Sequence, residues 1–185
     1  MLSDKDAKEI QKYYERCAEQ GANSEQIEES KRAMSKLSAI LGHPERLKRL
    51  AKDIVTHYET LCAEKPQIVQ KAMIVCADRT LAFRLYKKIE GLRSEWTIAK
   101  KTEDDSVLSS DKLDELVAIP KLNLVATRGD DDEKALYDLC GTKEHRKFLD
   151  EQFKNNDSNF KIAIVVDMWI TGFDVPSLAV MYIDK

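Results

Sequence analysis

The chain has 185 residues and a formal net charge of −3, and 34% of its residues are charged. This length fits one domain with an appendage, and the nearly balanced charge excludes a chain that binds nucleic acid by being basic throughout. No apolar run approaches the ~20 residues that cross a bilayer. The N-terminus lacks the basic and apolar parts of a signal peptide, so we expect a cytoplasmic protein with no membrane contact.

Cysteine usage favours neither a zinc site nor a redox motif. The four cysteines are far apart and form no Cys-x-x-Cys pair; they are Cys17, Cys62, Cys76 and Cys140. Zinc and dithiol sites need closely spaced ligands. We therefore expect free, reduced thiols and no metal site in this chain.

Residues 1–65 are predicted to be helical. Gly42 and His43 interrupt the apolar spacing, and Pro44 is suited to the first turn of a new helix. Beyond it, apolar side chains recur every three or four residues, as on one face of an amphipathic helix: Leu47, Leu50, Ile54, Tyr58 and Leu61. The pattern predicts a helical connector or extension that precedes the main domain.

From residue 66 the period of the apolar residues changes. Short apolar runs predict strands at residues 72–76, 96–99, 122–127, 161–166 and 179–183. Helical spacing predicts helices at residues 79–90, 111–118, 130–140 and 142–155. Because strands that alternate with helices form βαβ units, we predict an α/β fold over residues 66–185, with a parallel sheet flanked by helices.

The segment from residue 161 to residue 176 carries the most information about function. Residues 162–166 are apolar without alternation, which is typical of a parallel strand buried on both faces. Thr171, Gly172 and Asp174 follow, and ligands of open α/β sheets bind beyond the carboxyl ends of such strands. The three residues are therefore a candidate site; the alternative is a glycine turn with Asp174 as a cap. Trp169 is predicted to pack, and an exposed ring there would stack on a base.

Two further strand ends carry candidate contacts to a nucleic-acid backbone. Asp78, Arg79 and Thr80 follow the first predicted strand and open a helix. Unpaired N–H groups at a helix N-terminus attract phosphate, and Arg79 adds a positive charge. Thr127 and Arg128 have the equivalent place after the strand at residues 122–127. The alternative is that Asp78 caps the helix and the arginines are only solvated.

Charged runs at two predicted helix starts allow less specific predictions. Arg146 belongs to a basic run, residues 143–147, that either contacts DNA backbone or is only solvated. The acidic run at residues 130–133 is predicted to lie in a first helical turn, where carboxylates complement the helix dipole, rather than to bind a metal.

No phosphate-binding loop of the Gly-x-x-x-x-Gly-Lys-Ser/Thr type is present. Gly141, Thr142 and Lys143 have similar letters in another order, and they predict the end of one helix and the capped start of the next. No predicted strand ends in a metal-binding Asp-Glu pair. We therefore expect that the chain alone does not hydrolyse ATP.

Three segments together resemble a known family. Residues 165–178 resemble motif V of superfamily 2 helicases, and in detail that of the motor (R) subunit of type I restriction enzymes. Residues 71–79 are similar to helicase motif IV, and residues 141–148 also agree with the R subunit. The three occur in the order of the family over about the last two thirds of the chain.

The resemblance implies that residues 66–185 form the second RecA-like lobe of an ATP-driven DNA translocase. Thr171, Gly172 and Asp174 would then face the nucleotide cleft, while ATP and Mg²⁺ are held mainly by a first lobe outside this chain. Arg79, Thr80, Thr127, Arg128 and Arg146 would contact the backbone of double-stranded DNA. Other implied partners are the nuclease domain of the same protein and the specificity and methyltransferase subunits.

The resemblance also implies that the chain is a fragment, because the family continues beyond Lys185 towards its motif VI arginines. Two alternatives stay open from the residues. One is a lobe of another superfamily 2 translocase or helicase, and the other is a non-catalytic α/β module that binds a partner protein.

Overall fold

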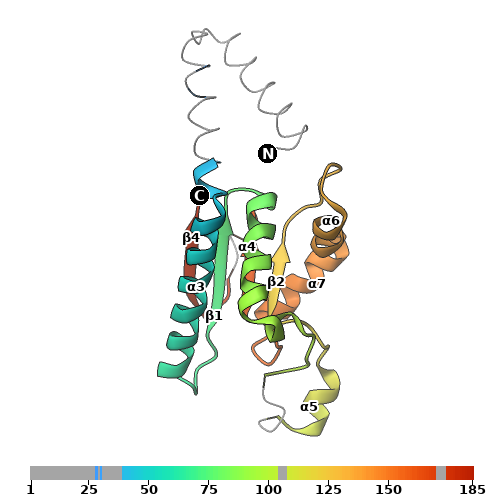
Figure 1. The fold of residues 1–185 in the computed structure, drawn as a ribbon. Helices are drawn as coiled ribbons and strands as arrows, with labels where there is room; N and C mark the ends of the chain where they lie inside the picture. The colour runs from blue at the N-terminus through green and yellow to red at the C-terminus, as the bar shows by residue number, and fades with distance from the viewer. Residues whose placement is uncertain (1–27, 29, 31–38, 104–107, 170–173) are drawn as a thin grey trace.

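A computed structural model describes residues 28, 30, 39–103, 108–169 and 174–185. Within these ranges helices precede and separate the first three strands, and the fourth strand follows the third without a described helix between them (Figure 1). In chain order the elements are α3 (Pro44–Glu64), β1 (Lys71–Cys76), α4 (Arg79–Leu92), the 3-10 helix η1 (Ser94–Thr97), α5 (Ser110–Glu115), β2 (Leu122–Val125), α6 (Lys134–Cys140), α7 (Lys143–Lys154), β3 (Ile162–Val165) and β4 (Leu178–Asp184).

The strands form one parallel sheet in the order β2-β3-β1-β4. Ala72 of β1 pairs with Ile162 of β3, which in turn pairs with Leu122 of β2. Every residue of β1, β2 and β3 is buried. Strands that are buried on both faces need helices on both faces, and this arrangement confirms the predicted α/β fold.

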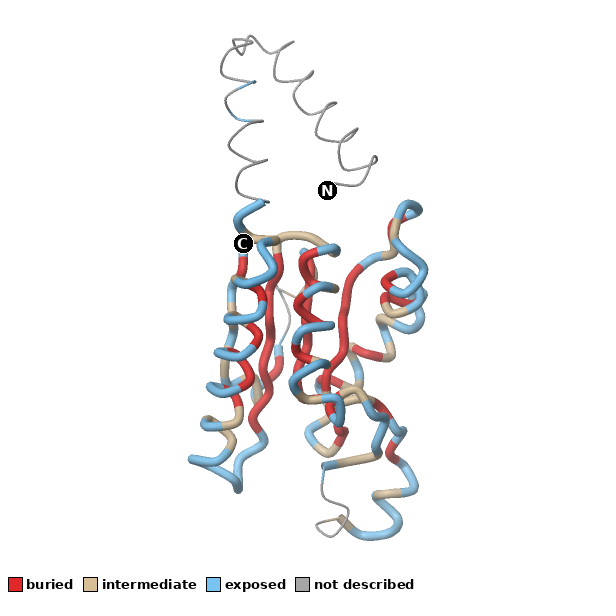
Figure 2. The backbone as a smooth tube through the Cα atoms, viewed as in Figure 1, coloured by how far each residue is buried: buried red, intermediate tan, exposed pale blue. Residues whose placement is uncertain are grey.

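Helices lie on both faces of the sheet, and a separate apolar core fills the space between the sheet and the helices on each face. Figure 2 shows the buried residues along the strands and the inner sides of the helices. Alternate residues of β1 serve each core: Ile74 packs in the first and Val75 in the second. The first core contains the apolar faces of α3 and α4, represented by Leu47 and Leu85. The second contains the inner face of α7, where Phe153 contacts Phe160 with ring centroids 4.8 Å apart. The amphipathic stripe that predicts α3 is thus the stripe that packs on the sheet.

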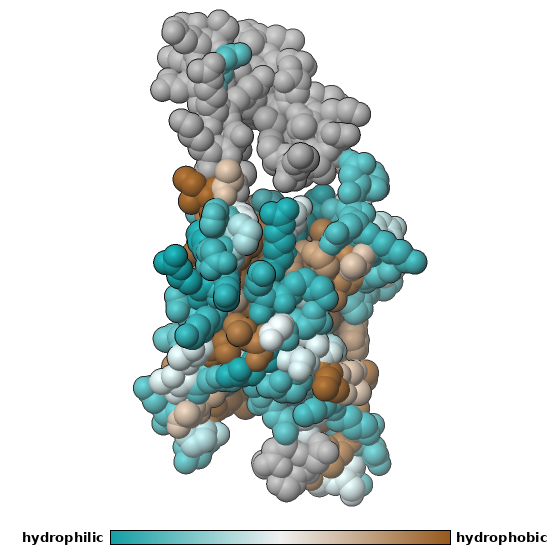
Figure 3. Space-filling model, viewed as in Figure 1, coloured by the Kyte–Doolittle hydropathy of each residue, from teal (hydrophilic) through white to brown (hydrophobic). Residues whose placement is uncertain are grey.

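Strand β4 lies at the edge of this sheet and is only half covered. Val180 and Tyr182 pack against the first core. On the opposite face, Met181 is 43% exposed and Ile183 is 73% exposed. Elsewhere the face seen in Figure 3 is mostly hydrophilic, with small apolar patches. No described helix is long and apolar enough to cross a membrane.

Two predicted elements differ in the structure. The strand predicted at residues 96–99 is wrong: this region forms η1, whose turn places the buried Trp96 against Tyr58 with ring centroids 5.9 Å apart. Only Lys100 makes an isolated antiparallel bridge, to Ile119. The helix predicted at residues 111–118 is shorter, because this bridge and the following proline favour an extended chain after α5.

A buried lysine connects the amino ends of the strands to the end of α7. Lys71, at the start of β1, is fully buried, and its Nζ donates to the backbone oxygens of Phe153 and Asn155 at the end of α7. The last carbonyls of a helix have no partner within the helix, so these hydrogen bonds satisfy groups that would otherwise be unpaired. Burial, and then the charge of Lys161, lower the pKa of Lys71 to about 8.

We expect the stability of the wild-type chain relative to Lys71→Met to rise with pH. The folded pKa of Lys71 is about 8, and an unfolded lysine titrates near ~10.4. Between these values the unfolded state binds more protons than the folded state, so the free energy of unfolding increases with pH. The slope is at most about 1.4 kcal/mol per pH unit.

Urea denaturation of both proteins at several pH values across this window measures the effect. Lys88→Met is the matched control, because Lys88 is an exposed lysine on α4; its curve should stay parallel to that of the wild type. A constant difference between wild type and Lys71→Met would contradict the prediction.

Candidate functional site

The carboxyl ends of the four parallel strands lie at one edge of the sheet, the upper edge in Figure 1. The segments that leave this edge contain most of the residues singled out in the sequence. Arg79 follows β1, Thr127 and Arg128 follow β2, and Asp167 follows β3. The topology therefore gathers residues that are far apart in the chain, at the edge where ligands of open α/β sheets bind.

The start of α4 has the aspartate cap that was named as an alternative in the sequence analysis. Oδ1 of Asp78 accepts a hydrogen bond of 2.7 Å from the backbone N of Leu81. This contact confirms the capping role of Asp78. Thr80, in the first turn, is exposed. The cap uses one of the N–H groups at the helix N-terminus and fixes the direction in which Arg79 leaves the sheet.

Arg79 is fixed by the loop that follows β2. Its Nε donates to Oδ1 of Asp132 at 3.1 Å, and the other carboxylate oxygen accepts a hydrogen bond of 2.6 Å from the backbone N of Gly129. The guanidinium lies directly on Gly129, where an added Cβ would be 2.3 Å from Nη2. Asp132 thus joins the loops after two strands that are not neighbours in the sheet.

The acidic run at residues 130–133 does not have the predicted role. Helix α6 begins at Lys134, so the run precedes the helix instead of forming its first turn, and Glu133 at the N-cap position makes no side-chain cap. Asp132 turns back to bond Gly129 and Arg79. The position of this carboxylate is therefore determined by its ion pair with Arg79, 53 positions away in sequence, and not by the helix dipole. No group of three metal-ligating side chains occurs among the residues that the structure describes.

Arg128 and Arg146 are also held at this end of the molecule. The guanidinium of Arg128 lies 4.2 Å from the ring centroid of Tyr137, and its Nε donates to the backbone oxygen of the same residue. Arg146 donates to the backbone oxygen of Gly141 at 3.4 Å. Thr127 is exposed. Gly141 has a φ of 62°, and Thr142 accepts from the backbone N of His145, so the predicted glycine stop and threonine cap are confirmed.

Charged groups from several segments act on the thiol of Cys140. Burial is the largest cause that raises the pKa of the Cys140 thiol to about 11, and Asp132 raises it further, whereas the charges of Arg79, Arg146 and Arg128 lower it. Cys140 is fully buried at the end of α6. Arginines from three separate segments therefore lie within electrostatic reach of one thiol.

The segment after β3 is described only in part. Thr171 and Gly172 lie outside the described residues, and Asp174 is exposed. Trp169 stacks on Phe153 with ring centroids 5.5 Å apart, which confirms its predicted packing role. Asp167 and Trp169 have φ values of 51° and 61°. Residues other than glycine rarely adopt this left-handed region, and such strain often marks a functional segment.

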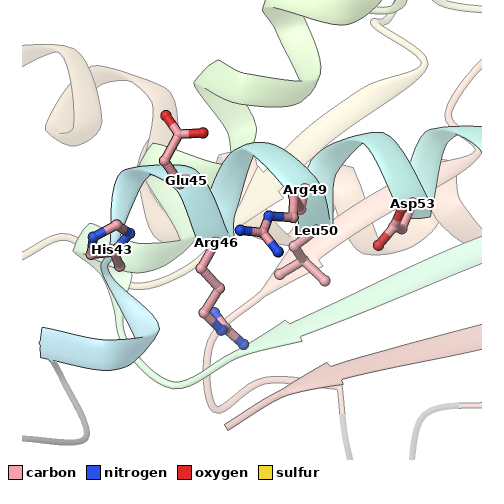
Figure 4. Close-up of a pocket in the computed structure, with 6 residues that line it drawn as sticks. All are labelled: His43, Glu45, Arg46, Arg49, Leu50 and Asp53. Atoms are coloured by element: carbon pink, nitrogen blue, oxygen red, sulfur yellow. The ribbon is translucent and has the colours of Figure 1, made fainter.

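A contact between the start of α3 and the end of β4 was not predicted from the sequence. Arg46 donates to both carboxylate oxygens of the buried Asp184, 138 positions away. Arg46 also lines a surface pocket of ≈360 Å³ with His43, Glu45, Arg49, Leu50 and Asp53. Figure 4 shows Arg46 directed from α3 towards the strands. No local pattern signals a pair so distant in sequence.

Comparison with known proteins places the chain in a family. The family model for domain 3 of type I restriction enzyme subunit R matches residues 1–185. The chain belongs to this family. A "Type I restriction enzyme HindI endonuclease subunit" of Haemophilus influenzae is 33% identical over 79% of the chain. A "Putative type I restriction enzyme MjaIXP endonuclease subunit" of Methanocaldococcus jannaschii is 31% identical over 93% of the chain.

This R-subunit domain spans only a small part of those relatives, 12% of the first and 14% of the second. The family agrees with the resemblance carried by residues 71–79, 141–148 and 165–178. It favours the R subunit over a lobe of another superfamily 2 translocase or helicase.

Replacing Asp78 with alanine should lower the free energy of unfolding by about 1 kcal/mol, the usual cost of losing a helix N-cap. Thr142→Ala, which removes the cap of α7, should cost a similar amount. Asp174→Ala serves as the control and should leave stability unchanged, because Asp174 is exposed. Chemical denaturation of the three variants measures the differences. Equal stability of Asp78→Ala and wild type would show that the cap contributes nothing.

Proposed function

We propose that this chain is the second RecA-like lobe of an ATP-dependent DNA-translocating motor, and that the intact protein is the R subunit of a type I restriction enzyme. One observation carries the proposal: three arginines from separate segments meet around the loop after β2 and helix α6, beyond the carboxyl ends of a parallel sheet. Arg79 lies on Gly129, Arg128 donates to the backbone of Tyr137, and Arg146 donates to the backbone of Gly141. Family membership supports the enzyme class, and the chemistry of the edge supports the role of this lobe within it.

The arginines are suited to contact phosphate rather than to read bases. Arg79 is the first residue of α4 and Arg146 the fourth residue of α7, so both lie near the backbone N–H groups of a helix start. Contacts to phosphate position a protein on DNA without reading its sequence. A motor that moves along any DNA needs contacts of this kind.

The net charge of −3 sets a limit on how the lobe binds. Neutralising phosphates is the main source of affinity for a DNA backbone, so an acidic chain with one local basic cluster binds weakly by itself. We infer that the DNA track is completed by the first lobe of the same protein, and that the contribution of this chain is measurable in the assembled motor.

Nucleotide binding is assigned to the segment after β3. Thr171, Gly172 and Asp174 would close over ATP whose phosphates and Mg²⁺ are held by the first lobe, because this chain has no phosphate-binding loop. The left-handed backbone at Asp167 and Trp169 supports the assignment, since it redirects the chain immediately before these residues. Hydrolysis of ATP at this site would supply the free energy that moves the lobes along DNA.

In the intact R subunit this lobe would act beside a nuclease domain and with the specificity and methyltransferase subunits. The relatives are named as endonuclease subunits, and a subunit of that kind works in a complex on DNA. Translocation by the motor would bring distant DNA to the nuclease, which cuts it.

Arg79→Ala and Arg146→Ala in the intact R subunit should each weaken binding equally on unrelated duplexes. Each change removes about one phosphate contact, so the slope of log K against log salt should become shallower by about one unit. Arg84→Ala is the matched control, because Arg84 is an exposed arginine on the same helix as Arg79, one turn and more away from the edge. Titrations on two duplexes over a salt series measure the slopes. An unchanged slope, or a loss confined to one duplex, would rule out backbone contact.

Asp174→Ala in the intact R subunit should reduce DNA-dependent ATP turnover and leave the melting temperature unchanged. Loss of a positioned polar group at a nucleotide site commonly costs about 3 kcal/mol of transition-state stabilisation, which is a drop of roughly 10²-fold in rate. Asp114→Ala, the same change at an exposed aspartate of α5 outside the site, is the control. If Asp174→Ala hydrolyses ATP at the wild-type rate, Asp174 only stabilises the turn and does not act at the nucleotide site.

A further inference from the structure

We propose that Asp132 and Gly129 form a positioning device that holds Arg79 at the DNA track. This inference rests on the proposed contact between Arg79 and the DNA backbone. It assigns a function to the acidic run at residues 130–133, which the sequence had placed in a helical turn. Asp132 and Gly129 act through Arg79 and need not touch DNA themselves.

The geometry fixes the arginine from two sides. The carboxylate of Asp132 is itself immobilised, because one oxygen accepts from the backbone N of Gly129 at 2.6 Å while the other accepts from Nε of Arg79 at 3.1 Å. The side chain of Asp132 is 6% exposed, whereas that of Arg79 is 24% exposed. The acid therefore lies beneath the arginine, and the arginine remains accessible to a ligand at the edge.

Glycine at position 129 is required by space and not by backbone conformation. Its φ is not positive, so an alanine there adopts the same backbone without strain. Its Cβ, however, would lie 2.3 Å from Nη2 of Arg79 and 3.0 Å from Oδ1 of Asp132. Gly129→Ala consequently moves the guanidinium without removing any charge from the protein.

Positioning and simple charge neutralisation predict opposite results. If Asp132 only weakened the positive field of Arg79, Asp132→Asn would tighten DNA binding, because it removes a negative charge next to a phosphate. If Asp132 holds Arg79 in place, the same variant weakens binding despite that gain in charge. Asp131→Asn, an exposed neighbour, makes the identical charge change and reports the purely electrostatic effect.

The test is a mutant cycle in the intact R subunit, read as DNA affinity and salt slope, with melting temperatures measured in parallel. For each phosphate contact, log K falls by ~0.9 for every tenfold rise in salt concentration. The loss of affinity caused by one missing contact is therefore about eightfold larger at about 0.1 M salt than at 1 M salt. We expect Arg79→Ala and Gly129→Ala to show this loss and a slope shallower by about one. The double variant should be no weaker than Arg79→Ala alone, since both changes remove the same contact.

The outcomes separate the two proposals. If Arg79→Ala has the expected effect while Gly129→Ala binds as wild type, the positioning device is refuted and the DNA contact stands. If Arg79→Ala itself binds as wild type, the DNA contact fails, and the positioning role fails with it. Should Gly129→Ala not fold, the comparison of Asp132→Asn with Asp131→Asn decides: tighter binding in both would overturn the positioning role.

Discussion

The complete burial of three adjacent parallel strands is the constraint from which the rest of the structure follows. Residues of β1 face two cores in alternation, so helices must cover both faces, α3 and α4 on one and α7 on the other. Parallel strands also require connections that return to the same edge before each new strand. The starts of α4 and of the segments after β2 and β3 are thereby brought to one edge of the sheet, and the candidate site is a consequence of the topology that buries the core.

Local patterns were sufficient to predict the elements that are long and strongly periodic. The stripe from Leu47 to Leu61 gave α3, and the uninterrupted apolar runs gave β1 and β3, because burial on one face or on two leaves different spacings in the sequence. The caps at Asp78 and Thr142 were predictable for the same reason, since each bonds an N–H group three residues away. The strand predicted at residues 96–99 is wrong because a segment of four residues is too short to show a distinct period. There the packing of Trp96 against Tyr58 decided the conformation.

Less of the candidate site than of the fold could be predicted from the sequence. The arginines of the site could be selected individually from their places at strand ends and helix starts, but the contacts that hold them beside Gly129, Tyr137 and Gly141 could not be predicted from spacing. The bond from Asp132 to Arg79 joins residues of different loops, and that from Arg46 to Asp184 joins opposite ends of the described chain. Such pairs depend on strand order, and strand order depends on contacts distant in sequence. The prediction that the acidic run forms a first helical turn was wrong for this reason. The preference of carboxylates for helix starts is local, whereas the contact of Asp132 with Arg79 exists only in the folded chain.

The half-covered edge strand has a consequence for the behaviour of the chain in solution. Met181 and Ile183 are exposed on one face of β4, and no strand of the part of the chain that the structure describes pairs with its outer side. An open edge with apolar side chains is a template for pairing between copies, and natural sheets usually protect it with a charge, a proline or a covering segment. Prepared in isolation at high concentration, this domain is prone to associate edge to edge through β4. The surface through which copies would associate thus lies at one edge of the sheet, and β2 with the loop that holds Arg79 lies at the other.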